Sequence, residues 1–265
     1  YGKKKKKHDC AYKVKNEEYG VGNCIAEMHD LDENGNVAHY DVLFGLGVEK
    51  NVTLALKLIK SAAEKGILSA KVTLGSLYAD GKVIPIDYGS SFKWLLKAAN
   101  KGHTGSQYNL GFFYFKGLGV VKDYKKASEW FIKASEKGDQ YADYYLGLLY
   151  YDGKGVSKDL TLASKHLLNA SKKISKTDKL YGILHYNLGS FYSKGIIFAK
   201  DDTLALKHFK LSADSGYSSS QVALGLHHLA TTKNTEIGLK LLSIPLFYTS
   251  DAAADPSPVM PAGSQ

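Results

Sequence analysis

The chain is 265 residues long and carries 35 lysine or arginine residues against 26 aspartates and glutamates, a formal net charge of +9. It contains no run of about 18 apolar residues, the length needed to cross a bilayer, so a membrane-spanning helix is excluded. Only two cysteines occur, Cys10 and Cys24, and both precede the repeated part of the chain that they would have to crosslink. This usage favours a soluble protein of an intracellular, reducing compartment.

The first predicted element is a basic tail over residues 1–15. It holds seven lysines and one aspartate, which is +6 of the net charge and leaves +3 for the other 250 residues. We expect a solvated, flexible tail. The alternative is a contact with an anionic partner, such as nucleic acid, an acidic lipid surface, an acidic protein tail or a nuclear import receptor, through Lys3, Lys4, Lys5, Lys6 and Lys7. Because the sequence begins with tyrosine and not methionine, we leave open the interpretation that a targeting peptide has been removed.

A small β element is predicted over residues 16–51. Apolar and polar residues alternate on both sides of Asn34-Gly35, a dipeptide typical of tight hairpin turns. With the glycines that precede the first strand, this segment resembles a Tudor-like or Src-homology-3-like small barrel. Such barrels bind short peptides or modified side chains through aromatic cages, and Tyr40 and Phe44 alone do not make one.

Two other interpretations compete for the same segment. Four oxygen-bearing residues have the spacing of a calcium-binding loop, with Gly35 at its sixth position: Asp30, Asp32, Asn34 and Asp41. Against calcium, the last of these is aspartate where such loops carry glutamate. The second alternative is a degenerate first repeat, because Gly45-Leu46-Gly47-Val48 matches a turn that recurs further along the chain. No other metal or cofactor is expected.

The rest of the chain is a repeat array. The pair Leu-Gly recurs at Leu74, Leu110, Leu146, Leu188 and Leu224, in steps of 36, 36, 42 and 36 residues. A period of this length indicates stacked supersecondary units that bury their apolar faces against one another. The predicted repeat region spans 52–248, divided into 52–66, 67–102, 103–138, 139–180, 181–216 and 217–248. Prolines among alanines and serines predict an extended tail over 249–265.

Each repeat is predicted to be an antiparallel helix pair. In the repeat 103–138, Ser106, Leu110, Phe113 and Tyr114 share one face of a first helix, which ends at a glycine turn at Gly117. An aspartate suited to a helix N-cap follows six residues later. The same turn glycine and aspartate recur as Gly81 and Asp87, Gly153 and Asp159, and Gly195 and Asp201. A second helix then places Ala127, Trp130, Phe131 and Ala134 at helical spacing.

At these residues the chain resembles the Sel-1-like repeat family, a relative of the tetratricopeptide repeats. Ser106 to Gly138 meets nearly all of that pattern, Ala-x-Tyr-x-Leu-Gly-x-x-Tyr, Gly-x-Gly-Val, Lys-Asp, Lys-Ala, Trp, Lys-Ala, Gly. The resemblance implies a mostly α-helical fold, a right-handed α-solenoid, that gathers other proteins into a multi-subunit complex without catalysing a reaction. The repeat 139–180 departs from the pattern, because it lacks the closing glycine and carries about six extra residues.

An aromatic stripe is the predicted partner-binding site. If Leu110 and Tyr114 face inward, the opposite side of the first helices in two repeats is rich in large side chains. Helix faces of this kind line the concave surface of solenoids, and an exposed aromatic patch marks an interaction site. The predicted contact residues are Asn109, Phe112, Phe115, Tyr145, Leu148 and Tyr151. We expect truncation of Phe112 or Tyr145 to weaken partner binding while changing stability little.

Catalytic motifs are missing from the sequence. No Gly-x-Ser-x-Gly nucleophile motif occurs, and His166 and His208 occupy the second-helix position of a tryptophan, which predicts packing residues. We therefore expect a non-enzymatic adaptor or scaffold. The alternatives are a nucleic-acid- or membrane-associated factor that uses the lysine run, and a calcium-responsive adaptor. Adaptor function further predicts no nucleic-acid affinity in the repeats near physiological ionic strength.

Overall fold

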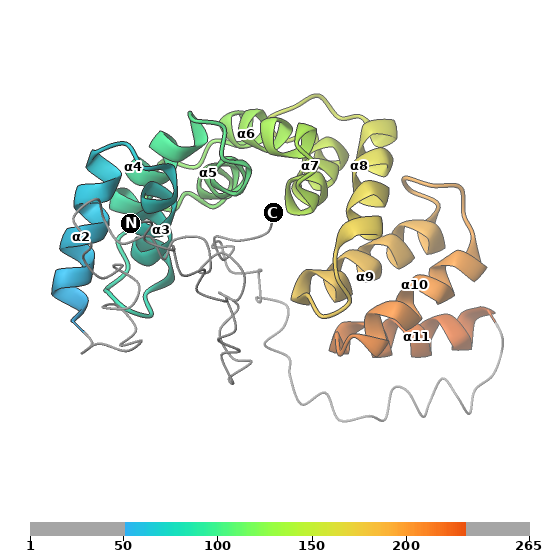
Figure 1. Cartoon of the computed structure of the whole chain (residues 1–265). Coiled ribbons are helices and arrows are strands. Elements are labelled where there is room, and N and C mark those ends of the chain that lie inside the picture. Colours follow the sequence, from blue (N-terminus) through green and yellow to red (C-terminus); the bar gives the residue numbers. More distant parts are fainter. Residues whose placement is uncertain (1–50, 232–265) are drawn as a thin grey trace, which may run out of the picture. The chain divides into compact units, whose positions relative to one another are not determined.

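The structure is a computed structural model that describes residues 51–231 of the chain. Within this range every regular element is a helix (Figure 1). The predicted basic tail, nearly all of the β element with its hairpin and calcium-loop interpretations, and the C-terminal tail lie outside the described residues. In the part that is described, the expected architecture of stacked helix pairs is confirmed.

Ten helices follow one another in the described part. Their bounds are α2 Val52–Glu64, α3 Leu68–Asp80, α4 Tyr88–Ala99, α5 Thr104–Lys116, α6 Tyr124–Glu136, α7 Gln140–Asp152, α8 Leu160–Lys173, α9 Lys179–Lys194, α10 Asp202–Asp214 and α11 Ser218–Thr231. Four close pairs form, α3 with α4, α5 with α6, α7 with α8, and α9 with α10. No helix among residues 52–231 is long and apolar enough to cross a membrane.

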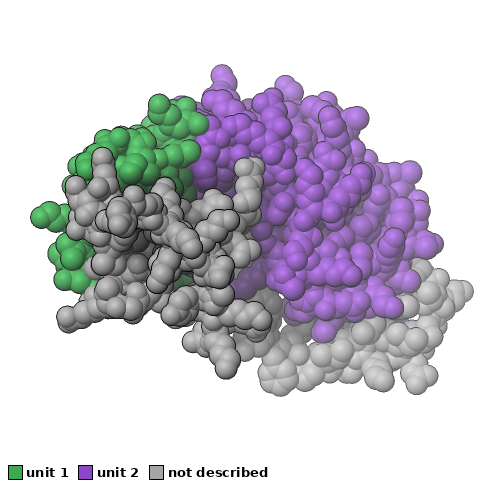
Figure 2. Space-filling model, viewed as in Figure 1, with its two compact units in different colours: residues 1–101, 259–265 green, residues 102–258 purple. Residues whose placement is uncertain are grey.

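The chain divides into two compact units, whose described residues are 51–101 and 102–231 (Figure 2). In the first unit the core forms where α2 and α4 pack on α3, around Ile59, Leu74 and Leu95. In the second unit Leu110, Leu146 and Leu188 of the Leu-Gly pairs are fully buried. The recurring leucine is therefore a core residue of the first four of these repeats, as its spacing indicates, whereas Leu224 of α11 is half-buried.

Aspartate caps begin the second helix of each pair, as predicted. Asp87, Asp123, Asp159 and Asp201 each accept a hydrogen bond from the backbone N–H three residues later, at 2.8–3.0 Å. Each bond satisfies one of the N–H groups that a helix start leaves without a partner. The cap thereby fixes where the second helix begins.

Glycines do two different things in each repeat, and α5 shows both. Gly117 ends the helix at φ +78°, a left-handed conformation that glycine adopts without strain. Gly111 lies inside the helix, where an added Cβ would stand 2.5 Å from the Phe131 ring of α6. The missing side chain therefore allows the two helices of the pair to approach closely, and Gly75, Gly147 and Gly189 meet a second-helix side chain in the same way.

The extra residues of the repeat 139–180 form a loop and part of a helix. Without a closing glycine, α8 continues to Lys173 and ends at Ile174, whose backbone is extended and whose side chain is buried. After a short loop, α9 begins at Lys179 and runs for 16 residues, against 13 in α5 and α7. The insertion is thus absorbed at the junction of two repeats, and the Leu188 packing position is kept.

Candidate functional site

The predicted aromatic stripe lies mostly inside the molecule. Phe112 and Tyr145 are each 2% exposed, and their rings meet edge to face at 5.5 Å. Tyr145 also stacks on Phe131 of α6, with centroids 5.3 Å apart and planes 8° apart. Burial raises the pKa of the Tyr145 hydroxyl, as expected for a phenol removed from water. The expected exposure of Phe112 and Tyr145 is therefore wrong, because these rings fill the junction between two repeats.

Asn109 is the third predicted contact residue that the structure buries. Its side chain is 3% exposed, and its Oδ1 atom has no hydrogen-bond partner within residues 51–231. The physical reason is shared with Phe112 and Tyr145. A first helix packs on its own second helix and also on the first helix of the next repeat, as α5 does on α7. Two faces of α5 are thus covered, whereas the sequence pattern indicates only one.

The other three predicted residues reach the surface in part. Phe115, Leu148 and Tyr151 are each half-buried. Phe115 packs on Tyr145 at 5.2 Å between ring centroids, and Tyr151 packs on Phe191 of α9 at 4.9 Å. We call Phe115, Leu148 and Tyr151 the aromatic edge. Phe115 and Tyr151 are anchored by buried rings, and all three members are in part exposed to solvent.

Lysines lie over the rings next to the aromatic edge. The Lys116 Nζ atom is 5.6 Å from the centroid of Phe115, and the Lys158 Nζ atom is 5.6 Å from that of Tyr151. Between them, Tyr124 at the start of α6 contacts Phe115 edge to face at 5.5 Å. Ammonium groups this close to ring faces are held by cation–π attraction, so positive charge is fixed beside apolar surface.

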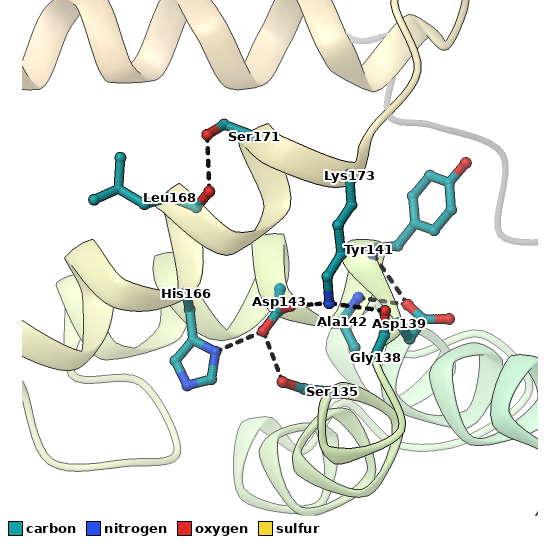
Figure 3. Close-up of polar contacts among 10 residues, drawn as sticks. All are labelled: Ser135, Gly138, Asp139, Tyr141, Ala142, Asp143, His166, Leu168, Ser171 and Lys173. Carbon is teal, nitrogen blue, oxygen red and sulfur yellow. Dashed lines mark hydrogen bonds and ion pairs between the residues drawn. The ribbon is translucent and has the colours of Figure 1, made fainter.

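A buried carboxylate joins three helices of the same unit (Figure 3). Asp143 of α7 is 2% exposed and its Oδ1 atom lies 2.8 Å from His166 Nδ1 of α8. Ser135 of α6 donates its hydroxyl to the same oxygen at 2.7 Å, and Lys173 Nζ stands 3.7 Å from Oδ2. A buried charge with three polar partners is compensated, so Asp143 stabilises the packing of α6, α7 and α8.

The residue types around Asp143 invite comparison with a hydrolase triad, but the contacts differ. In such a triad the serine bonds to the imidazole, which removes its proton. Here Ser135 bonds to the carboxylate, and His166 stacks on Tyr150 with planes 7° apart. Within residues 51–231 the serine hydroxyl therefore bonds to the carboxylate, and the imidazole bonds to that same carboxylate oxygen. The arrangement therefore supports packing and not acyl transfer, in line with the prediction for His166.

A second polar pair occupies the matching positions one repeat later. His185 of α9 and His208 of α10 face each other with their Nδ1 atoms 2.8 Å apart. Burial lowers the pKa of both imidazoles to about 4, helped at His185 by the neighbouring His208 and at His208 by Lys207. At neutral pH one neutral ring donates to the other. The buried Nε2 atom of His185 has no hydrogen-bond partner within the described range.

Sequence reasoning missed Asp143 and His185 as partners of the two histidines. Both pairs are separated by 23 residues, which matches neither helix nor strand periodicity. The signal becomes visible only when the repeats are aligned, because the two pairs then coincide. Over residues 51–231 no three histidine, cysteine or acidic side chains converge as a metal site. The lysine run and the calcium-loop residues lie outside this range.

Comparison with known proteins follows the same repeats. A family model described as Sel1 repeat matches residues 36–67, 70–103, 104–139, 140–173 and 184–217. Its first match favours the degenerate first repeat among the interpretations of the N-terminal segment, at least from residue 36 on. No match was found among curated proteins.

Two solved structures are similar over most of the chain. A Sel1 repeat protein from Oxalobacter formigenes is 32% identical with a TM-score of 0.64, covering 77% of this chain and 80% of its own. A protective antigen of uropathogenic Escherichia coli strains, which displays an SLR fold, is 29% identical with a TM-score of 0.68 over 77% of this chain. The present chain spans 43% of that antigen's length. Because the family model matches more than half of the chain and the helix pairs of the structure lie within these repeats, the chain belongs to the Sel1 repeat family.

Proposed function

We propose that this chain is a non-enzymatic adaptor that holds partner proteins within a larger complex, with the aromatic edge as part of its contact surface. Sel1 repeat proteins are generally scaffolds for protein–protein interaction, which supports the class. The observation that carries the site is the half-buried state of Phe115, Leu148 and Tyr151. Aromatic side chains that are held rigidly and still reach solvent are typical anchors of protein interfaces.

The edge differs between repeats in a way that supports a local site. Phe115 and Tyr151 occupy the same position of their repeats, where the next repeat has Ser193 and the preceding one has Ala79. Ala79 is buried, and Ser193 has no large apolar group to offer a partner. Large rings at this position are thus confined to α5 and α7 among the four helix pairs. A partner contact is expected there and not along the whole array.

The test is affinity purification of the full chain followed by mass spectrometry, with variants compared quantitatively. Phe115→Ser combined with Tyr151→Ser gives both positions the residue that α9 already carries. Leu226→Ser is the matched control, because Leu226 of α11 is a large apolar side chain that is 55% exposed and lies outside the edge. Proteins enriched by the native chain are expected to fall about tenfold or more with the double variant, the loss typical of an interface anchor.

Circular dichroism distinguishes a loss of partner binding from a loss of folding. The double variant must retain the helical spectrum and cooperative melting of the native chain, because Phe115 also packs on Tyr145. With folding preserved, equal recovery of partners by the double variant and by Leu226→Ser would contradict the proposed contact surface.

A further inference from the structure

The described repeats are strongly basic, although the chain average hides it. Residues 51–231 contain 25 lysines against 14 aspartates and glutamates, a formal charge of +11. Residues 16–50 contain one lysine against eight acidic residues, a charge of −7. The value of +3 outside the basic tail is thus the sum of +11 in residues 51–231, −7 in residues 16–50 and −1 in residues 232–265. The repeats themselves are thus positively charged, and this charge favours a partner with a negatively charged surface.

Part of this charge is gathered at the aromatic edge. Lys122 Nζ lies 5.4 Å from the centroid of Tyr124, and Lys154 Nζ lies 5.9 Å from the same ring. With Lys116 over Phe115 and Lys158 over Tyr151, four ammonium groups stand over three rings, of which Phe115 and Tyr124 contact each other. We call these seven residues the lysine–aromatic edge: Phe115, Lys116, Lys122, Tyr124, Tyr151, Lys154 and Lys158.

The lysine–aromatic edge is continuous from one repeat to the next. Gly155 follows the α7 helix at φ +72°, and an added Cβ there would stand 2.2 Å from the backbone carbonyl of Tyr124. The loop of the repeat 139–180 is therefore packed directly against the first residue of α6. This contact places Lys154 over a ring of the preceding repeat and joins the two halves of the edge.

Two of the four lysines of the lysine–aromatic edge are not neutralised by acidic neighbours within the described residues. Lys122 and Lys158 are exposed, and neither forms an ion pair within residues 51–231. Lys154 is paired with Asp152 at 2.6 Å. Burial and the charge of nearby Lys122 lower the pKa of Lys116, which agrees with a local excess of positive charge. A ligand with carboxylates would relieve that repulsion while covering the rings.

We propose that the lysine–aromatic edge binds an acidic peptide segment of a partner protein, in which carboxylates alternate with apolar side chains. The proposal deepens the adaptor function and rests on it. Carboxylates would pair with Lys122 and Lys158, and apolar side chains would lie on the rings of Phe115 and Tyr151. Charge pairs of this kind set partner choice and association rate, while the rings supply the anchoring area.

Nucleic acid fits this surface less well. All 35 cationic side chains of the protein are lysines, and it has no arginine, the residue that binds phosphate in a two-point geometry. Carboxylates are also interspersed with the lysines, because Asp123 and Asp159 cap α6 and α8 and Asp152 pairs with Lys154. A continuous phosphate backbone would meet these carboxylates, whereas a peptide can place an apolar residue opposite each of them.

The test measures binding of a fluorescent twelve-residue peptide, glutamates alternating with leucines and phenylalanines, to the full chain at physiological salt. The variant is Lys122→Glu with Lys158→Glu. Its control is Lys165→Glu with Lys210→Glu, which makes the same change in net charge at two exposed lysines of α8 and α10. Every variant is also measured with Lys3–Lys7 replaced by glutamine, so that the basic tail does not contribute. We expect about tenfold weaker binding for the edge variant and about twofold for the control.

Three results would overturn the proposal. The first is no binding by the native chain, and the second is equal weakening in the edge and control variants, which would show a nonspecific charge effect. The third is tighter binding of a twelve-nucleotide single strand than of the peptide, lost on charge reversal at the edge. If partner capture is lost with Phe115→Ser and Tyr151→Ser but kept on charge reversal, the adaptor function stands and the acidic partner is excluded.

Discussion

Two neighbouring repeats place polar pairs at matching positions with different electrostatics. In the repeat 139–180, the buried carboxylate of Asp143 accepts from His166 and has further partners in Ser135 and Lys173. In the repeat 181–216, the same two positions hold His185 and His208, two neutral rings that share a hydrogen bond between their Nδ1 atoms and stack with centroids 5.0 Å apart. One backbone thus accommodates either pair. A repeat position requires complementary hydrogen bonding, while the charge of the pair is free to differ.

The two repeats also differ in how they fill the junction with their neighbours. Tyr145 of α7 packs on Phe112 and Phe131. Its counterpart in α9 is Asn187, which donates a hydrogen bond to the Tyr144 hydroxyl at 3.2 Å. At this position the first junction has a ring within a buried aromatic cluster, whereas the second has a smaller polar side chain beside the Tyr151–Phe191 contact. Stability is therefore expected to be concentrated around α5, α6 and α7.

The largest expected effect on stability comes from removing the aromatic ring at the first junction. Tyr145→Ala removes a buried ring from a filled interior and should lower the free energy of unfolding by about 3–5 kcal/mol. Asn187→Ala is the matched change one repeat later, and losing its hydrogen bond should cost about 0.5–1.5 kcal/mol. Urea denaturation followed by circular dichroism measures both. Similar midpoints for the two variants would contradict a junction held by the aromatic cluster.

The misassignment of Tyr145 shows where prediction from sequence ends in this fold. The helix pairs and the caps at Asp87, Asp123, Asp159 and Asp201 follow from local patterns that recur at one period, so they could be predicted. The contact of α5 with α7 depends on how one repeat lies on the next. A single helical face carries no information on that contact. The sequence pattern therefore predicts surface positions for Phe112, Tyr145 and Asn109. In the structure only Phe115, Leu148 and Tyr151 of the predicted stripe are partly exposed.

A second prediction tests the charged pair of the comparison. Asp143→Ala leaves Ser135 and His166 without their common acceptor, and the free energy of unfolding should fall by about 1–3 kcal/mol. The remaining groups keep some access to water, since the His166 and Lys173 side chains are 16% and 43% exposed. This access places the effect below that of an isolated buried charge.

The control for Asp143 is Asp152→Ala in the same helix. Asp152 pairs with Lys154 at the surface, where an ion pair contributes little to stability. Its variant should keep the native midpoint in urea. A shift in Asp152→Ala as large as that in Asp143→Ala would mean that the Asp143 network has no special role in joining α6, α7 and α8.

The smallest expected effect is a pH dependence that distinguishes the two pairs. The pKa values of His185 and His208 are lowered to about 4 from an ordinary 6.5, so the unfolded chain binds more protons between these values. Stability from this pair is therefore fully present above about pH 6.5 and is lost as the pH falls towards 4. Between pH 7 and 6 the expected loss is on the order of 1 kcal/mol, and few carboxylates titrate there.

Replacing His185 by aspartate, the residue at the matching position of the neighbouring repeat, should reverse the change of stability with pH. His185→Asp places a carboxylate opposite His208, as Asp143 stands opposite His166, and a carboxylate favours the charged imidazole and raises its pKa. The variant should then gain stability between pH 7 and 6, because its folded state now binds the extra proton more tightly than the unfolded chain does.

Urea midpoints at pH 6.0, 6.5 and 7.0 measure how stability changes with pH. The control is His185→Gln combined with His208→Gln, which removes both titrating rings. If the native chain and this control show the same slope, the histidine pair is not the source of the pH dependence. If His185→Asp keeps the native slope, the two positions are not electrostatically equivalent, and the matched geometry of the two repeats does not extend to their protonation.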